Sequence, residues 1–401
     1  MSLEKMNLME RRSAWMLASI MSLRMLSLFM VLPVFSLYAH QLTGATPALI
    51  GLSMGVYGLT QALFQIPFGA WSDKIGRKKI ITLGLIIFAI GSMLSACSTH
   101  IWTMIIGRAL QGAGAVGSTI IALMADLTRE NQRTKAMAII GITIGMSFSL
   151  AMLLGPLLNP WLHVNGIFWL AAGFSILAIF MLYAAVPQPA KTIWHADTEP
   201  ERHSFFAMLK HPSLARLNIS IFMLHAVFTA SFVVIPISLH TLAGLSGNHQ
   251  WMLYLPILLL AFVCSIPCII IAEKKHRLKW FFLSAIFMLG CAEFIFWRFA
   301  NHISFSAFSL FLFFTGFSVL EAFLPSLVSK TAPPARKGTA LGIYSCSQFL
   351  GIFAGGSLGG WLYGVFGLTS VYLFCTILTL LWAAIAFNMK NPQHQTLSSP
   401  A

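Results

Sequence analysis

Apolar stretches of about 20 residues, the length that an α-helix needs to cross a lipid bilayer, recur along the whole sequence. Apolar residues make up 58% of the 401 residues, and charged residues only 9%. A water-soluble chain with this composition would aggregate, because it has too few polar residues to cover its surface. The sequence therefore indicates an all-α polytopic membrane protein.

The apolar stretches predict twelve transmembrane helices, separated by polar or Pro- and Gly-rich breaks. The longest polar stretch divides them into an N-terminal six-helix bundle (1–186), a cytoplasmic central loop (187–216), a C-terminal six-helix bundle (217–388) and a cytoplasmic tail (389–401). The expected spans are 14–40, 46–72, 79–97, 101–125, 136–158, 166–186, 217–240, 250–272, 279–298, 303–329, 338–363 and 367–388.

Positive charge orients these helices. All but three of the 25 Lys and Arg residues lie at one side of the expected bundle, the exceptions being Arg24, Arg108 and Arg298. Basic loops stay in the cytoplasm during membrane insertion, so we expect a multi-pass inner-membrane protein with both termini cytoplasmic. The first stretch is too long for a signal-peptide core and is expected to be retained. The net charge of +14 then reports topology and requires no nucleic-acid partner.

Cofactor and metal chemistry have no recognisable basis in the sequence. The six cysteines lie in or beside apolar segments, without the spacing of a metal site or a disulfide framework. We expect no cofactor, no metal and a monomer.

The two halves share weak sequence similarity at a constant offset. Ile66-Pro67 precedes Asp73 as Ile266-Pro267 precedes Glu273, and Gly155 and Trp161-Leu162 return as Gly355 and Trp361-Leu362. Such a repeat predicts two bundles related by a two-fold axis along the membrane normal, with a substrate site between them.

The segment GAWSDKIGRKK, Gly69 to Lys79, concentrates charge between two glycines. We expect Gly69 to allow close helix packing and Gly76 to allow a tight turn. Asp73 is expected to face the positive N-terminal end of the helix that starts near Gly338-Thr339-Ala340. Arg77 is expected to pair with Asp126. Together these residues would form a conformational latch on the cytoplasmic face. The alternative is that the charges only enforce topology, which explains the bases but not Asp73 or the glycines.

These motifs resemble those of the major facilitator superfamily. GAWSDKIGRK is similar to its loop signature, and IIGRALQGAGA, with Arg108, Gln111 and Gly112, resembles its second motif. The resemblance extends over the whole chain and implies two pseudo-symmetric bundles that transport by alternating access. Similar exporters carry a soluble domain after the last helix, whereas this chain ends shortly after it.

The fifth expected helix resembles the antiporter motif of twelve-helix drug:proton exporters. Gly141, Gly145 and Gly155-Pro156 carry the resemblance. Ala151 replaces one glycine of the motif and Asn159-Pro160 replaces a Gly pair, so the match is imperfect.

Five ionisable residues fall within expected spans, where each costs about 2.5–3.5 kcal/mol or more and needs a reason. The resemblance implies that the helices carrying Arg24, Arg108, His225 and Glu321 line the pathway. Glu321 or Asp126 is expected to carry the coupled proton, with Arg108 as a modulator. Alternatively, Glu321 only hydrogen-bonds a neighbouring helix. We expect His225 to be a packed histidine. The fifth residue, Glu293, is expected to be a peripheral carboxyl that is neutral or bonded to a neighbour.

Polar residues at helical spacing predict the rest of a sparse cavity lining: Tyr57, Gln61 and Gln65 on one face, Arg108 with Gln111, and Tyr344 with Gln348. The remaining wall would come from Phe and Met, which accommodate amphipathic organic compounds. Small residues repeat in the fifth and eleventh helices, where we expect close packing on the opposite half. Six histidines at the outer face are expected to be ordinary interfacial residues rather than pH sensors.

The sequence thus predicts a secondary active transporter, with proton-coupled export of small amphipathic organic compounds or drugs as the preferred function. The alternative within transport is a proton symporter or facilitator for a polar metabolite. A membrane enzyme is disfavoured because no clustered nucleophile or phosphate-binding motif is present, and a receptor because no large soluble segment is present. The expected partners are a small molecule, protons and the lipid bilayer.

Overall fold

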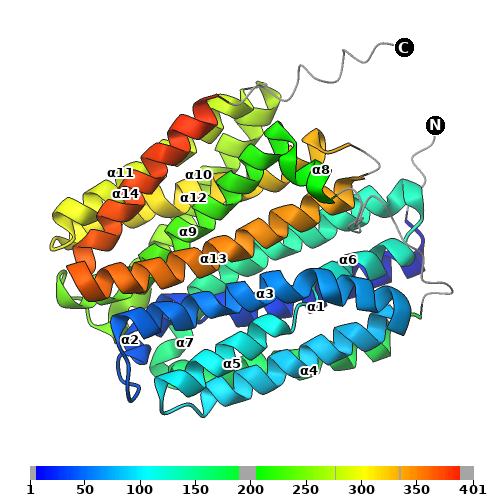
Figure 1. Ribbon diagram of the computed structural model, residues 1–401, viewed down its shortest axis with the longest axis horizontal. Helices are drawn as coiled ribbons and strands as arrows, with labels where there is room; N and C mark the ends of the chain where they lie inside the picture. The colour runs from blue at the N-terminus through cyan, green and yellow to red at the C-terminus, as the bar shows by residue number, and fades with distance from the viewer. Residues whose placement is uncertain (1–5, 189–204, 276, 334–335, 389–401) are drawn as a thin grey trace.

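The computed structural model describes residues 6–188, 205–275, 277–333 and 336–388. These residues form helices joined by short connections (Figure 1). The expected tail and most of the expected central loop lie outside the described residues. The helices are α1 (Leu8–Phe29), α2 (Leu32–Ala39), α3 (Pro47–Ile75), α4 (Arg77–Ala96), α5 (Ile101–Ala113), α6 (Gly117–Asp126), α7 (Glu130–Ala185), α8 (Phe205–Lys210), α9 (Pro212–Thr241), α10 (Gln250–Lys274), α11 (Leu278–Phe299), α12 (Ile303–Thr331), α13 (Lys337–Phe366) and α14 (Leu368–Phe387), with a 3₁₀ turn, η2 (Gly247–His249), before α10.

The described helices agree with twelve membrane crossings. Eleven helical stretches are long and apolar enough to span a bilayer, and one of them, α7, contains two spans. Two boundaries differ from expectation. The short helix α8 lies in the expected central loop, and α9 begins at Pro212, whose missing N–H costs nothing at a helix start.

The two spans of α7 meet at His163. Its backbone has φ 53° and ψ 174°, a conformation that side-chain-bearing residues rarely adopt and that costs about 1–3 kcal/mol. We expected separate helices with a connection here. Instead the chain reverses by a single strained residue, shortly after Pro156 and Pro160.

Two of the expected spans are broken. The first divides into α1 and α2 at Met30 and Val31, and Pro33 occupies the first turn of α2. The fourth divides into α5 and α6 at Gly114 to Val116. Both breaks leave backbone carbonyl groups without their helical hydrogen bonds inside the bilayer. Other groups of the protein must donate hydrogen bonds to these carbonyl groups instead.

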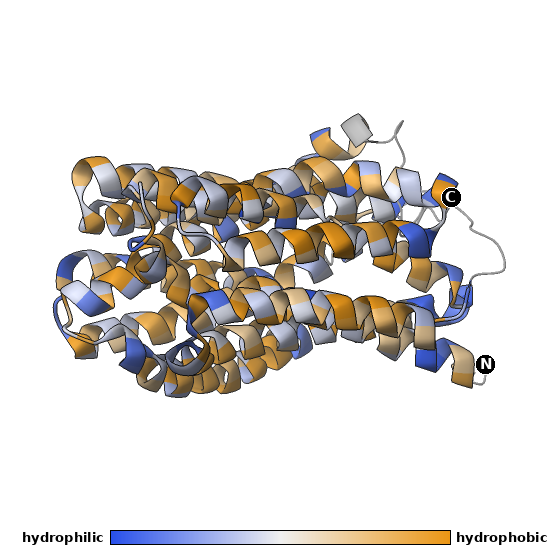
Figure 2. Ribbon diagram, turned by 90° about the horizontal axis from the view of Figure 1, so that it is seen from below, coloured by the Kyte–Doolittle hydropathy of each residue, from blue (hydrophilic) through white to orange (hydrophobic). Residues whose placement is uncertain are grey.

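The helices form two layers, seen edge-on in Figure 2. Helices α1 to α7 pack on one another, and α9 to α14 do the same. The longest contact between the layers joins α3 and α13, which run side by side through the centre of Figure 1. The exposed sides of the bundle are rich in large apolar residues such as Leu63, Phe180 and Leu380, as a lipid-facing surface requires.

Glycine lets the backbones of α3 and α13 touch. A Cβ placed on Gly51 would lie 2.2 Å from the carbonyl oxygen of Gly356, and one on Gly58 would lie 2.3 Å from that of Phe349. Toward the other end of the pair, the Sγ of Cys346 still lies 3.8 Å from the Ala62 oxygen. We call the end of the bundle where α1 begins and α14 finishes the basic end. The glycine contact lies toward the opposite end.

The expected repeat is visible in the packing. A Cβ placed on Gly155 of α7 would lie 1.9 Å from the Met30 oxygen, and one placed on Gly355 of α13 would lie 2.1 Å from the Ala226 oxygen. Each contact joins two helices of one half. The expectation that these stripes meet the opposite half is therefore wrong for Gly155 and Gly355, although it holds for Gly356.

Candidate transport site

The first half contributes a buried polar chain that starts at Arg24 on α1. Its Nη2 donates to Gln61 Oε1 at 2.6 Å and to the Gly114 oxygen at 2.9 Å. Arg24 thereby bonds a carbonyl group that the break between α5 and α6 leaves free. Gln61 also accepts from the Tyr57 hydroxyl at 3.3 Å and donates to Gln65 Oε1 at 3.2 Å. The three α3 residues thus share a face, as their spacing predicts.

Arg108 on α5 continues this chain. Its guanidinium lies 5.3 Å from the centroid of the Tyr57 ring, and its Nη1 donates to Gln111 Oε1 at 2.7 Å. Gln111 in turn donates to the Ser92 hydroxyl at 2.8 Å. The sequence reasoning did not identify Ser92. We name the set Arg24, Tyr57, Gln61, Gln65, Arg108 and Gln111 the first wall.

The first wall holds two cations with neutral partners. The recorded hydrogen bonds of Arg24 and Arg108 go to amide and backbone oxygens, and each guanidinium also faces an aromatic ring. Both side chains are buried. Among the described residues, neither forms an ion pair with a carboxylate, so both positive charges remain uncompensated in this half.

The second half contributes Glu321 on α12, beside His225 on α9. Gln348 of α13 donates from its amide nitrogen to Glu321 Oε1 at 3.4 Å, and the same nitrogen lies 2.8 Å from His225 Nε2. Glu321 Oε2 lies 3.9 Å from His225 Nε2. Tyr344 of α13 is buried, one helical turn before Gln348 and on the same helix face. We name Glu321, His225, Gln348 and Tyr344 the second wall.

The contacts of His225 define its tautomer. Its Nδ1 lies 3.3 Å from the Ile221 oxygen, an acceptor, so Nδ1 carries the proton. Nε2 then accepts from the Gln348 amide, and the ring is neutral. This fits the expected packed, hydrogen-bonded histidine.

Exposure distinguishes the two intramembrane carboxyl groups. The Glu321 side chain is 30% exposed, whereas Glu293 on α11 is fully buried. Glu293 Oε1 accepts from Ser231 Oγ at 2.6 Å, so Glu293 is the neighbour-bonded carboxyl that we expected. Glu321 is the carboxyl of the second wall, and part of its side chain is exposed, although its Oε2 atom is buried and has no hydrogen-bond partner among the described residues.

Aromatic rings lie between the walls. Phe148 of α7 stacks on Phe317 of α12 at 5.1 Å between centroids, and Phe317 lies 5.8 Å from the His225 ring. Tyr57 of the first wall meets Phe349 of α13 edge-on at 6.2 Å. The polar walls are therefore joined by an apolar, aromatic contact between the halves.

At the basic end, Arg77 pairs with Asp126 as expected, with Nε 3.1 Å from Oδ2 and both side chains fully buried. Arg77 also donates to Asp73 and, at 2.8 Å, to the Ser72 hydroxyl. The recorded ion-pair partner of Asp73 thus lies in its own half. The approach of Asp73 to the first turn of α13 stays a prediction.

The two glycines of this loop differ. Gly76 has φ 108°, so the expected tight turn is present and favours glycine. A Cβ on Gly69 would lie 3.6 Å from Ser118 Oγ, an ordinary contact that alanine would also make. The expectation that Gly69 allows unusually close packing is therefore wrong.

The sequence reasoning missed an ion pair beside this cluster. Arg129, just before α7, donates to Glu10 Oε1 from its backbone N–H at 3.0 Å and from Nε at 2.9 Å. Glu10 and Asn7 form a capping box at the start of α1. The four residues Asn-Leu-Met-Glu carry the signal for this cap.

The glycines of the antiporter-like segment do not act alike. A Cβ on Gly141 or Gly145 would meet nothing within 4 Å among the described residues, whereas Gly155, followed by Pro156, is tightly packed. Close packing thus explains the last glycine of the segment only.

Comparisons with known proteins agree with this architecture. The model of the Major Facilitator Superfamily matches residues 17–356 and 326–400. The chain is 43% identical to the inner membrane transport protein YajR of Escherichia coli (strain K12), over 97% of this chain and 86% of YajR. It is 24% identical to the multidrug resistance protein MdtH of Proteus mirabilis (strain HI4320), over 85% of this chain and 84% of MdtH.

Solved structures share the fold at low sequence identity. A bacterial homologue of the human lysosomal transporter Spinster, in an inward-facing and occupied conformation, matches with a TM-score of 0.80 and 14% identity over 99% of this chain and 100% of that chain. Family model, relatives and fold agree: the chain belongs to the Major Facilitator Superfamily and is a multi-pass membrane transporter.

Proposed function

We propose that this transporter couples proton entry to the export of small amphipathic organic compounds by alternating access. The observation that carries the proposal is the environment of Glu321 on the second wall. Its Oε1 accepts a hydrogen bond from the neutral amide of Gln348, and its Oε2 is buried without a hydrogen-bond partner among the described residues. A carboxyl group without a cationic partner in a low-dielectric site binds and releases a proton as its access to water changes.

His225 and Gln348 support a proton cycle at Glu321. When Glu321 is protonated, the second wall is neutral and can move without carrying a buried charge of its own. When Glu321 releases the proton, its charge attracts a cationic or hydrogen-bonding group of a ligand. Substrate and proton then compete for one carboxyl group, which is the physical basis of exchange.

The proposed substrate class follows from the aromatic contact between the walls. Phe148, Phe228 and Phe317 pack on one another close to His225, and we propose that separation of the halves would present their apolar faces to a ligand. Such surfaces bind molecules with a ring system and one polar group more readily than sugars. The relative MdtH is named for multidrug resistance, which favours the same class.

We propose that the basic end faces the cytoplasm, because Lys and Arg gather there. Asp73, Arg77 and Asp126 would then form the latch of the cytoplasmic face. In this state Asp73 pairs with Arg77. Closure of that face would bring Asp73 to the first turn of α13, near Gly338, with Arg77 held by Asp126.

Proteoliposomes with an imposed pH gradient test the coupling. We expect Glu321→Gln to lower gradient-driven transport of a fluorescent amphipathic dye at least tenfold, because the amide cannot carry a proton. Glu293→Gln is the matched control: it neutralises a buried carboxyl that is closed to solvent, and we expect transport within about twofold of the parent. Unchanged transport in Glu321→Gln would remove this residue from the coupling step.

A proton symporter or facilitator for a polar metabolite is the second candidate, and the first wall favours it. Two buried guanidinium groups with neutral partners suit a polar or anionic ligand. Accumulation of dye in inside-out vesicles that an uncoupler abolishes supports export. Metabolite flux that is independent of the gradient supports a facilitator.

A further inference from the structure

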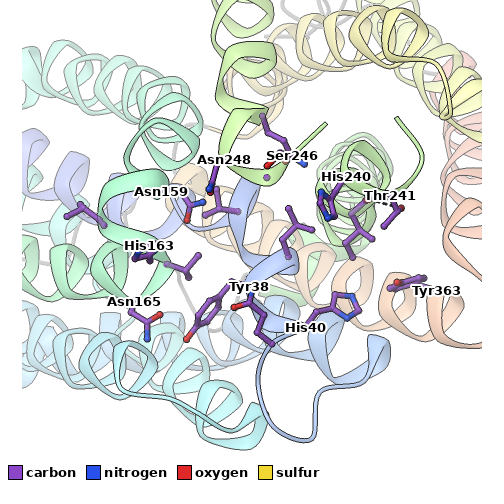
Figure 3. A pocket seen from close by; sticks show the side chains of 18 residues that line it. Tyr38, His40, Asn159, His163, Asn165, His240, Thr241, Ser246, Asn248 and Tyr363 are labelled. Atoms are coloured by element: carbon purple, nitrogen blue, oxygen red, sulfur yellow. Dashed lines mark hydrogen bonds between the residues drawn. The ribbon is translucent and has the colours of Figure 1, made fainter. Parts of the chain in front are cut away.

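A polar vestibule lies between the halves at the end opposite to the basic end. It has a volume of about 790 Å³ and is drawn in Figure 3. Helix α2 and the break in α7 line it from the first half, and α9, η2 and α13 line it from the second.

Three of the histidines at this end share the vestibule. His40 follows α2 and His163 sits at the strained break of α7, both in the first half, whereas His240 belongs to the end of α9 in the second half. The His40 ring meets Tyr363 of α13 edge-on, 6.0 Å between centroids, across the contact between the halves.

The vestibule contains no fixed charge to balance a protonated imidazole. Among the described residues that line it, none is Lys, Arg, Asp or Glu. The titratable groups that face the three histidines from α2, α7, α9 and α13 are the phenols of Tyr38 and Tyr363, which stay neutral at physiological pH. The remaining titratable neighbour is His249 of η2, between the lining residues Asn248 and Gln250.

From this arrangement we infer that the vestibule is a proton-binding site that opens the outer contact between the halves. Protonation at His40, His163 and His240 places like charges on both sides of the contact, without a counter-ion, and these charges repel one another. All three histidines are exposed in this state, so separation of the halves acts by increasing the distance between the imidazolium groups across the contact. Protons therefore bind more tightly to the open form, and by linkage acid stabilises that form.

The sign of the effect follows from the repulsion across the contact, and desolvation of His40 acts in the same direction. Loss of water around its ring lowers the pKa of His40 in the closed form from its ordinary value. The open form restores that value, near 6.5. As the external pH falls through this value, the closed form loses stability relative to the open form. The inference rests on the alternating access of the proposed function, and it adds a second, external proton site that is distinct from Glu321.

Distance measurements between spin labels test the inference. One label replaces Thr43 in the first half and the other replaces Asn301 in the second, both exposed and outside the vestibule, in a background with the exposed Cys97 replaced by Ser. The protein is reconstituted in nanodiscs, without substrate or gradient. We expect the ratio of long-distance to short-distance populations to rise at least about tenfold between pH 7.5 and pH 5.5.

Two sets of variants decide the outcome. His40→Gln with His240→Gln should remove most of this pH response, and adding His163→Gln should abolish it. The double variant suffices if the strained position does not tolerate Gln. The matched control replaces His100, His249 and His302, which do not line the vestibule, by Gln and should respond as the parent does.

Absence of the shift in the parent overturns the inference, and so does a shift that persists in the vestibule variants. A different result would overturn the proposed function. A pH-dependent opening without gradient-driven transport would leave the inference intact, whereas coupled transport without this opening would leave only the proposed function.

Discussion

Gly51 and Gly356 bring the backbones of α3 and α13 into direct contact, one from each half. A Cβ on Gly51 would lie 2.2 Å from the Gly356 oxygen and 2.6 Å from the Cα of Gly360. Backbone atoms cannot rotate away as a flexible side chain can, so the two helices must separate to admit a methyl group. This contact therefore reports directly on whether the halves are closed at that end.

Gly51→Ala should weaken the closed contact by about 1–3 kcal/mol, the usual cost of overpacking. A cysteine pair at Pro47 and Gly364 provides the measurement at the same end, because a Cβ on Gly364 would lie 3.5 Å from the Cβ of Pro47, within the range of a disulfide. We expect the disulfide yield under mild oxidation to fall several-fold in Gly51→Ala. Gly141→Ala, at a position with open space, should leave the yield unchanged. An undiminished yield in Gly51→Ala would contradict the backbone contact.

Arg24→Ala should lower the free energy of unfolding by about 1–3 kcal/mol, because the Gly114 carbonyl and the Gln61 amide oxygen would lose a buried donor. Thermal unfolding in detergent measures the change. Arg298→Ala serves as control, since Arg298 is exposed and lies against the Trp297 ring at the end of α11. We expect the control to stay within about 0.5 kcal/mol of the parent. Equal melting temperatures of the two variants would show that Arg24 does not stabilise the helix break.

Asp126→Ala should cost about 3 kcal/mol or more, because it removes a fully buried partner of Arg77. An exposed ion pair of the second half supplies the comparison. Glu273 pairs with Lys330 at 3.3 Å, and both side chains are about half exposed, 55% and 51%. Glu273→Ala should therefore cost less than about 1 kcal/mol. Chemical unfolding of the two variants, measured side by side, checks the difference, and a cost for Glu273→Ala that equals that of Asp126→Ala would refute it.

Local sequence patterns predicted those parts of the site that depend on helical spacing. Tyr57, Gln61 and Gln65 recur every four residues, and in the structure they form one hydrogen-bonded row. Arg77 and Asp126 lie 49 residues apart, yet the charge of both inside an apolar chain required a partner, and the expected pair is present. The family and the helical fold followed from apolar length and motif together.

Other features depended on contacts between distant segments. A break at Gly114 is stable because Arg24, 90 residues away, bonds the freed oxygen, and no local pattern contains that information. The strained turn at His163 likewise depends on the packing of α7 around it. The capping box of Asn7 and Glu10 was within reach of the sequence, because it is local, whereas the pairing of Glu10 with Arg129 joins distant segments and was not.

The two walls have a consequence for how such a protein can be rebuilt or can evolve. The halves repeat each other in fold, yet the arginines belong to the first wall and the acid belongs to the second. Two copies of the first wall would hold four guanidinium groups and no carboxyl group, and two copies of the second wall would hold carboxyl groups and no arginine. A chain built from two copies of either half would therefore lack the combination of charges found in the site.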